Sequence, residues 1–264
     1  MQIVTQDFAM SYVERGSGKP LLLIHGFPLS NKIWEPQTDG LAGAARLLAP
    51  DLRGHGESEA TPGPYTMDML ADDCVLLLDT LGVKQPAVVC GLSMGGYVAL
   101  AFFRKHRARL AGLILAATRA GADSPEGKTN REKSAARVRE EGIQAVIGSM
   151  LPKMLAPKTY DTNPALVERV ERIMEETSEE GMIAALLGMR DRPDSNPLLD
   201  RIDIPTLILH GADDQLIPVA EAEAMRSAIR DSKLEVLPVA GHLLNMEQPA
   251  LFNQTVRDFL ASIG

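Results

Sequence analysis

The chain has few cysteines, few aromatic residues and no excess of positive charge. Cys74 and Cys90 are its only cysteines, and Phe, Trp and Tyr together make up 4% of its 264 residues. Both cysteines lie in apolar stretches, so we expect small buried side chains and neither a disulfide framework nor a metal site. Lys and Arg number 27 against 35 Asp and Glu, a net charge of -8. This charge argues against nucleic acid or an anionic membrane as a partner.

Long apolar segments are also missing. The apolar runs have the length of strands and are far shorter than the roughly 20 residues that span a bilayer. Residues 1–7 show no positively charged stretch followed by an apolar core. We therefore expect a cytoplasmic protein with no membrane partner. The length and the 45% hydrophobic content suit one large α/β domain with a small insertion.

Short apolar runs recur along the chain and indicate the fold class. Most are nearly continuous, which is typical of parallel strands covered by helices on both faces. The runs are residues 21–24, 46–49, 87–90, 112–115, 206–209 and 234–237. Residues 3–13 instead alternate and are more polar, which favours an edge hairpin. We expect an α/β fold with a mostly parallel central sheet flanked by helices.

Residues 118–200 interrupt this pattern, because they contain no clear strand and read as three or four helices. Asn163 and Pro164 form a helix start, and Thr177 with Glu180 resembles a capping box. A helical block between two strands is a natural cap over the strand ends, where open α/β sheets bind ligands. We expect a core of residues 1–117 and 201–264 and a helical cap of residues 118–200.

Ser93 is the strongest candidate for chemistry. It lies in the run Gly91-Leu92-Ser93-Met94-Gly95-Gly96, between a strand-like and a helix-like segment. This is the strand–turn–helix context of the G-x-S-x-G nucleophile elbow. The glycines allow the two arms of the turn to pass closely, and the serine is expected in strained backbone geometry.

A serine nucleophile needs a base, and the base needs an acid that orients it. His242 follows the last strand-like run, at the sheet edge where we expect Ser93. Asp213 and Asp214 follow another strand and are both candidates for the acid. We expect His106 to be a solvated helix end, and structural roles for His55 and His210. The chain order Ser, Asp, His is that of the α/β-hydrolase arrangement.

The segment His25-Gly26-Phe27-Pro28 follows an early strand and could complete an oxyanion hole. The N–H of Met94, directly after the nucleophile, is one expected donor, and the N–H of Phe27 is the second. Pro28 has no N–H and cannot serve. Read alone, the segment fits an ordinary strand-end turn with a buried histidine equally well.

Together these motifs resemble the α/β-hydrolase fold enzymes with a helical cap, over nearly the whole chain. The resemblance also includes residues 51–58, Gly241-His242 and the spacing Gly211…Asp214…Pro218. In that family the acid lies three residues after the glycine and four before the proline, which selects Asp214. The Ser-Met-Gly-Gly elbow and residues 117–123 are similar to the group of 3-oxoadipate enol-lactonases, carboxylesterases and cofactor-free haloperoxidases.

The resemblance implies a serine hydrolase that cleaves esters or lactones of small, largely apolar substrates through an acyl-enzyme on Ser93. It implies no metal and no organic cofactor, and a monomer or small homo-oligomer. A perhydrolase or a C–C bond hydrolase would use the same triad. A slow-turnover ligand receptor on this fold is an alternative of another class. A histidine base must be neutral, so activity should fall below about pH 6–7.

The same resemblance suggests which side chains line the substrate pocket. The expected pocket residues are Leu29, Trp34, Met150, Met154 and Met189. Methionine adapts to varied apolar shapes, but packing of the cap against the sheet is the simpler interpretation of these methionines. The arginines that could anchor a substrate carboxylate are Arg119, Arg190 and Arg192, although neighbouring acids could satisfy Arg190 and Arg192 instead.

Overall fold

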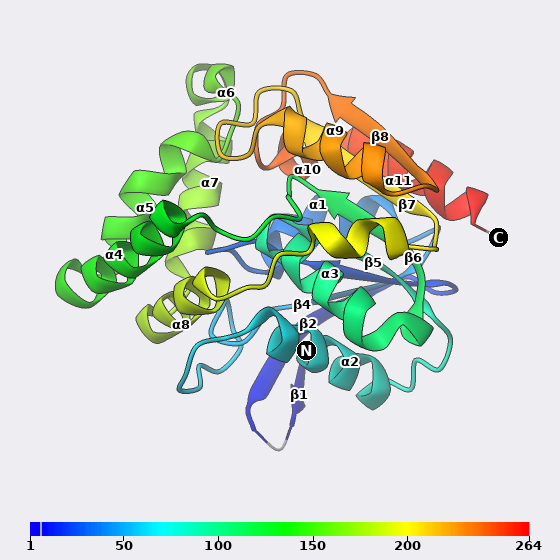
Figure 1. The fold of residues 1–264 in the computed structure, drawn as a ribbon, viewed down its shortest axis with the longest axis horizontal. Coiled ribbons are helices and arrows are strands. Elements are labelled where there is room, and N and C mark those ends of the chain that lie inside the picture. The colour runs from blue at the N-terminus through cyan, green and yellow to red at the C-terminus, as the bar shows by residue number, and fades with distance from the viewer. Residues whose placement is uncertain (6, 264) are drawn as a thin grey trace.

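The computed structural model describes residues 1–5 and 7–263. Within this part of the chain, an eight-stranded sheet with the order β1-β2-β4-β3-β5-β6-β7-β8 forms the centre of the molecule (Figure 1). Its strands are β1 Gln2–Val4, β2 Ala9–Arg15, β3 Pro20–Ile24, β4 Arg46–Pro50, β5 Ala87–Leu92, β6 Leu110–Ala116, β7 Thr206–Gly211 and β8 Ser232–Leu237.

Helices fill most of the connections between the strands. The α-helices of the described residues are α1 Glu35–Gly40, α2 Met67–Thr80, α3 Met94–His106, α4 Pro125–Glu141, α5 Gln144–Met150, α6 Pro157–Thr162, α7 Pro164–Glu175, α8 Glu179–Arg190, α9 Val219–Ala228, α10 Leu244–Glu247 and α11 Pro249–Ser262. Short 3-10 helices are η1 Asn31–Trp34, η2 Arg107–Arg109, η3 Leu151–Lys153 and η4 Asn196–Arg201. Every helix in residues 1–5 and 7–263 is too short or too polar to cross a membrane.

The predicted sheet is confirmed. Strands β3 to β8 are parallel to one another, whereas β1 and β2 form an antiparallel hairpin, and β2 joins the sheet by antiparallel pairing with β4. The nearly continuous apolar runs of the sequence are the parallel strands, because helices cover both of their faces. The alternating segment 3–13 is the edge hairpin.

Two apolar cores lie on the two faces of the sheet. Along β3, Leu22 and Ile24 face one core and Leu21 and Leu23 face the other, as the two-residue period of a strand requires. Helices α2, α3 and α9 contribute to the first core, and η1, α10 and α11 to the second. Because β3 to β8 are parallel, their carboxyl ends lie together at one edge of this covered sheet.

The stretch between β6 and β7 is helical, and Figure 1 shows its helices gathered at one end of the sheet. It contains five α-helices in fully described residues, where the sequence predicted three or four. Helix α7 starts at the predicted place, with the Asn163 side chain accepting a hydrogen bond from Leu166 N. Helix α8 is capped by Ser178 and not by Thr177, whose hydroxyl donates to the carbonyl of Pro28. The division into core and cap at residues 118 and 200 stays a prediction.

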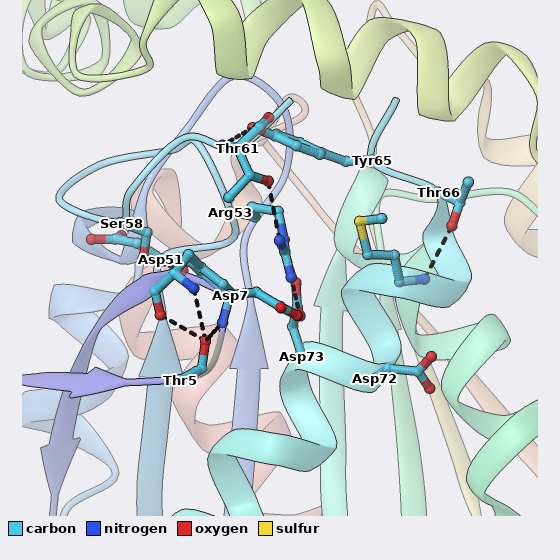
Figure 2. Close-up of polar contacts among 12 residues, drawn as sticks. Thr5, Asp7, Asp51, Arg53, Ser58, Thr61, Tyr65, Thr66, Asp72 and Asp73 are labelled. Carbon is cyan, nitrogen blue, oxygen red and sulfur yellow. Dashed lines mark hydrogen bonds and ion pairs between the residues drawn. The ribbon is translucent and has the colours of Figure 1, made fainter. Parts of the chain in front are cut away.

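The loop between β4 and α2 is fixed by a buried ion pair (Figure 2). The Arg53 guanidinium donates to both carboxylate oxygens of Asp73 on α2, with N–O distances of 3.0 and 2.7 Å. It also donates to Thr61, which in turn accepts from the Tyr65 hydroxyl through its carbonyl. A bidentate buried pair sets both position and orientation, so we assign this loop a structural role.

Candidate active site

Ser93 occupies a sharp turn between β5 and α3. Its backbone has φ 56° and ψ -113°, which is unusual for a residue with a side chain. Neighbouring hydrogen bonds maintain this geometry: Ser93 N donates to the carbonyl of Ala116, and the Thr118 hydroxyl donates to the carbonyl of Ser93. Strained backbone that is held in this way is typical of functional sites.

The turn closes because its two arms touch backbone to backbone. A Cβ added to Gly91 would lie 2.1 Å from the carbonyl oxygen of Gly95. A Cβ on Gly95 would lie 2.2 Å from the carbonyl oxygen of Ile24 at the end of β3. Only glycine fits at both positions. The serine is thereby held beside the loop that follows β3.

His242 and Asp214 are brought together by the ends of two other strands. Asp214 follows β7 and His242 follows β8, and His242 Nδ1 lies 2.8 Å from Asp214 Oδ2. Because a carboxylate only accepts, Nδ1 carries the proton of this hydrogen bond and Nε2 is left as the basic nitrogen. His242 and Ser93 line the same cavity.

The Asp214 carboxylate is buried but well satisfied. Its Oδ1 accepts from the backbone N–H groups of Leu216 and Ile217, at 2.8 and 3.0 Å. Burial favours a higher pKa for Asp214, but the charge and hydrogen bond of His242 and the two N–H groups outweigh burial, so the pKa lies below its usual value. A carboxylate that stays ionised can orient the imidazole and stabilise its charged form.

Asp213, the other candidate acid, has an exposed side chain. Its backbone N–H donates to the carbonyl of Ala240, which holds the β7 loop against the loop of His242. The structure therefore places Asp214, and not Asp213, beside the histidine.

His25 and His55 also lie near the site, in neutral, structural positions. His25 Nε2 accepts from the backbone N–H of Leu52, and His55 Nδ1 donates to the carbonyl of Arg53. Burial lowers the pKa of His25 to about 3, helped by the charge of His55, and burial lowers the pKa of His55 to about 4. His25 thus ties the loop after β3 to the loop after β4.

Phe27 and Met94, the predicted oxyanion donors, both lie beside Ser93. Phe27 lines the cavity in the loop after β3, and a Cβ on the preceding Gly26 would lie 3.1 Å from Ser93 Cβ. Met94 is the first residue of α3, so its N–H has no partner four residues earlier in the helix. The N-terminus of a helix also favours negative charge.

The cavity above Ser93 has a volume of about 320 Å³, which suits a small ligand. Residues of the helical stretch between β6 and β7 line it together with residues from the rest of the chain. They are Phe27, Ser93, Tyr97, Arg119, Asp123, Gly127, Asn130, Arg131, Ser134, Val146, Ser149, Met150, Leu186, Met189, Leu216, Ile217 and His242. Among the described residues, no group of three or more His, Cys, Asp or Glu side chains is placed to hold a metal ion.

The structure places two of the five predicted pocket residues, Met150 and Met189, in the cavity wall. Leu29, Trp34 and Met154 do not line it, contrary to the sequence-based expectation. All three are fully buried in the second core, and Trp34 packs against the ring of Phe252 at 6.0 Å. Their apolar side chains gain more from the closed core than from a solvated cavity.

The three candidate anchor arginines lie in different places relative to the cavity. Arg119 lines the cavity. Arg190 is outside it and pairs with Glu132 and Asp191 on the surface. Arg192 is buried behind the cavity, with its guanidinium 4.1 Å above the ring of Tyr97.

Several cavity residues were not predicted from the sequence, among them Tyr97 and Arg131. Tyr97 lies four residues after Ser93, and this one-turn spacing on a helix could have identified it. Arg131 belongs to the charged helix α4, whose sequence reads as a solvated surface. Only the packing of α4 against α8 and α5 in the folded chain shows that Arg131 faces the cavity.

Comparisons with known proteins agree with this geometry. A sequence model of the alpha/beta hydrolase fold family matches residues 19–249. The chain is 31% identical to 3-oxoadipate enol-lactonase 2 from Acinetobacter baylyi, and the match covers 96% of this chain and 94% of that protein.

Solved structures give a similar result. A malate-bound thermophilic esterase from Thermogutta terrifontis has a TM-score of 0.96 and 43% identity, with 100% of this chain and 98% of that chain covered. The enol-lactonase from Burkholderia xenovorans has a TM-score of 0.92 and 29% identity, with 99% and 100% covered.

Proposed function

Because the chain belongs to the α/β hydrolase fold family and is a hydrolase, we propose that it cleaves carboxylic esters or lactones through an acyl-enzyme on Ser93. The observation that carries the proposal is the shared cavity of Ser93 and His242, with Asp214 bonded to the far side of the imidazole. We assign nucleophile, base and orienting acid to these three residues. Phe27 and Met94 supply the oxyanion donors.

Acylation begins with the hydroxyl proton of Ser93 passing to Nε2 of His242. Ser93 Oγ attacks the carbonyl carbon, and the resulting oxyanion accepts hydrogen bonds from the N–H groups of Phe27 and Met94. Collapse breaks the bond between the carbonyl carbon and the alcohol oxygen, and His242 returns its proton to that oxygen. A lactone leaves its hydroxyl tethered to the acyl group.

Deacylation repeats these steps with a water molecule as the nucleophile. Nε2 of His242 takes a proton from a water molecule, and the hydroxide attacks the acyl carbon. The second oxyanion uses the same donors, and its collapse releases the carboxylic acid while the proton returns to Ser93 Oγ. Asp214 stays ionised throughout, which agrees with the direction of its pKa.

Relatives support esters and lactones as the substrate class. Both an enol-lactonase at 31% identity and an esterase at 43% identity match almost the whole chain. The cavity volume of about 320 Å³ favours small acyl and alcohol groups.

A covalent label tests the assignment of the nucleophile. A small fluorophosphonate should react once per chain, and peptide mass spectrometry should place the label on Ser93. Ser93→Ala is the control and should remain unlabelled. Labelling of another residue, or equal labelling of the two proteins, would remove Ser93 from the proposed role.

A further inference from the structure

Three arginines converge on a single carboxylate at the wall of the cavity. Arg119 Nη2 lies 2.6 Å and Arg192 Nη1 2.9 Å from Asp123 Oδ1, and Arg131 Nε lies 3.1 Å from Asp123 Oδ2. Burial favours a raised pKa for Asp123, but Arg131 and Arg192 outweigh it and keep the pKa below the usual value. Asp123 is therefore a fixed negative charge.

The cluster carries more positive than negative charge. Among the described residues, Asp123 is the only acid that forms an ion pair with Arg119, Arg131 or Arg192. Glu221 also acts on Arg119 electrostatically, but it does not line the cavity. Because the whole chain has a net charge of -8, this positive excess is a local feature of the cavity.

The three arginines have different surroundings. Arg192 is buried and donates to the backbone carbonyls of Met189 and Gly121. These N–H groups are therefore used within the fold. Arg119 and Arg131 line the cavity and remain partly exposed. Nε is the only donor of Arg131 with a hydrogen-bond partner in the described chain. Nε of Arg119 is buried and has no partner among those residues.

We propose that Arg119 and Arg131 bind a carboxylate of the substrate, so that the preferred substrates are small esters or lactones with a second, anionic group. This inference rests on the proposed function and names its substrate class. Guanidinium groups recognise carboxylates through paired N–H donors. In a narrow cavity, two positive charges without full compensation also attract anions more strongly than they would in open water.

The site lies within reach of Ser93. Tyr97 follows Ser93 by one turn of α3, about 5.4 Å along the helix axis, and lines the same cavity. Tyr97 also lies within side-chain hydrogen-bond reach of Arg119. A substrate of a few carbons could therefore place its ester at Ser93 and its carboxylate at the arginines.

Matched pairs of esters test the proposal. Monomethyl glutarate and methyl hexanoate compare an anionic with a neutral acyl group, and 3-acetoxypropionate and propyl acetate compare the alcohol groups. For at least one pair, wild-type kcat/KM should be at least ten-fold higher for the anionic ester than for the neutral ester.

Variants of Arg131 test whether this arginine causes the preference. Arg131→Gln should lower the ratio of the two kcat/KM values about ten-fold, and Arg131→Lys should lower it less. Arg137→Gln, on the same helix but paired with Glu141 at the surface, is the matched control and should leave it unchanged.

Binding without turnover gives a second measurement. Ser93→Ala should bind glutarate in calorimetry, more weakly at high salt, and Ser93→Ala/Arg131→Gln should bind it at least ten-fold more weakly. Two results would overturn the inference. One is a kcat/KM for the neutral ester that equals or exceeds that for the anionic ester in both pairs. The other is a preference for the anionic ester that is unchanged in Arg131→Gln. If Ser93→Ala hydrolyses the neutral esters as fast as the wild type, the proposed function itself fails instead.

Discussion

At the scale of single residues, Asp214 is the buried charge on which the proposed mechanism depends. Asp214→Asn would place an amide N–H against His242 Nδ1 and favour the wrong tautomer. We expect kcat for p-nitrophenyl butyrate to fall by about 10⁴-fold with little change in fold. The neighbouring Asp213→Asn is the control and should keep wild-type kcat. Equal activity of both variants would exclude Asp214 as the orienting acid.

Asp51 gives a prediction about stability and pH. Burial raises the pKa of Asp51 to about 6, against the hydrogen bonds from Asn31 N and Glu57 N. A raised acid pKa means that the folded state holds the proton more tightly than the unfolded state. The contribution of Asp51 to the free energy of unfolding is therefore largest below pH 4 and falls as the pH rises through 6.

The contribution of Asp51 to the free energy of unfolding should change by about 2–3 kcal/mol over this pH range. Urea unfolding of wild type and Asp51→Asn at pH 4.5 and pH 7.5 measures it. The stability of the wild type relative to the variant should be lower at pH 7.5 than at pH 4.5. A difference that is the same at both pH values would contradict the assignment of this titration to Asp51.

At the scale of elements, Glu247 on α10 links the helical block to the loop of His242. Its Oε1 accepts from Ala156 N and Thr159 Oγ1, at 2.9 and 2.5 Å, and its Oε2 accepts from Gly241 N at 2.6 Å. Gly241 directly precedes the proposed base. The carboxylate therefore sets the position of His242 relative to the start of α6.

Glu247→Gln replaces one accepting oxygen with a donor that faces another N–H group. We expect a loss of about 1.5–3 kcal/mol in the free energy of unfolding, with a lower kcat as the loop of His242 loosens. Urea unfolding and steady-state kinetics check both effects. Glu235→Gln, on the exposed face of β8, should change neither. Wild-type kcat in a destabilised Glu247→Gln would show that Glu247 holds the fold but not the site.

The elements differ in how far the sequence predicted them. The parallel strands were predictable because their apolar runs are continuous, and α7 was predictable because Asn163 and Pro164 form a strong start signal. The number of helices between β6 and β7 was not, since α5 and α6 have only seven and six residues. Two turns or fewer carry too little periodicity to separate a helix from a loop.

At the scale of the whole molecule, the sheet explains what the sequence could predict of the site. Ser93, Asp214 and His242 each follow a strand, and parallel strands end at a common edge. Which side chains line the cavity depends on how the helices between β6 and β7 pack over the sheet. The sequence did not predict that Arg131 faces the cavity or that Trp34 packs in the second core.

The most direct test of the account compares wild type and Ser93→Ala on p-nitrophenyl acetate and butyrate at pH 8. We expect rapid wild-type hydrolysis, and a rate at least 10³-fold lower in the variant, since only the oxyanion donors and binding would remain. Circular dichroism should show the same fold for both proteins. Equal rates for the two folded proteins would contradict Ser93 as the nucleophile and, with it, the proposed acyl-enzyme.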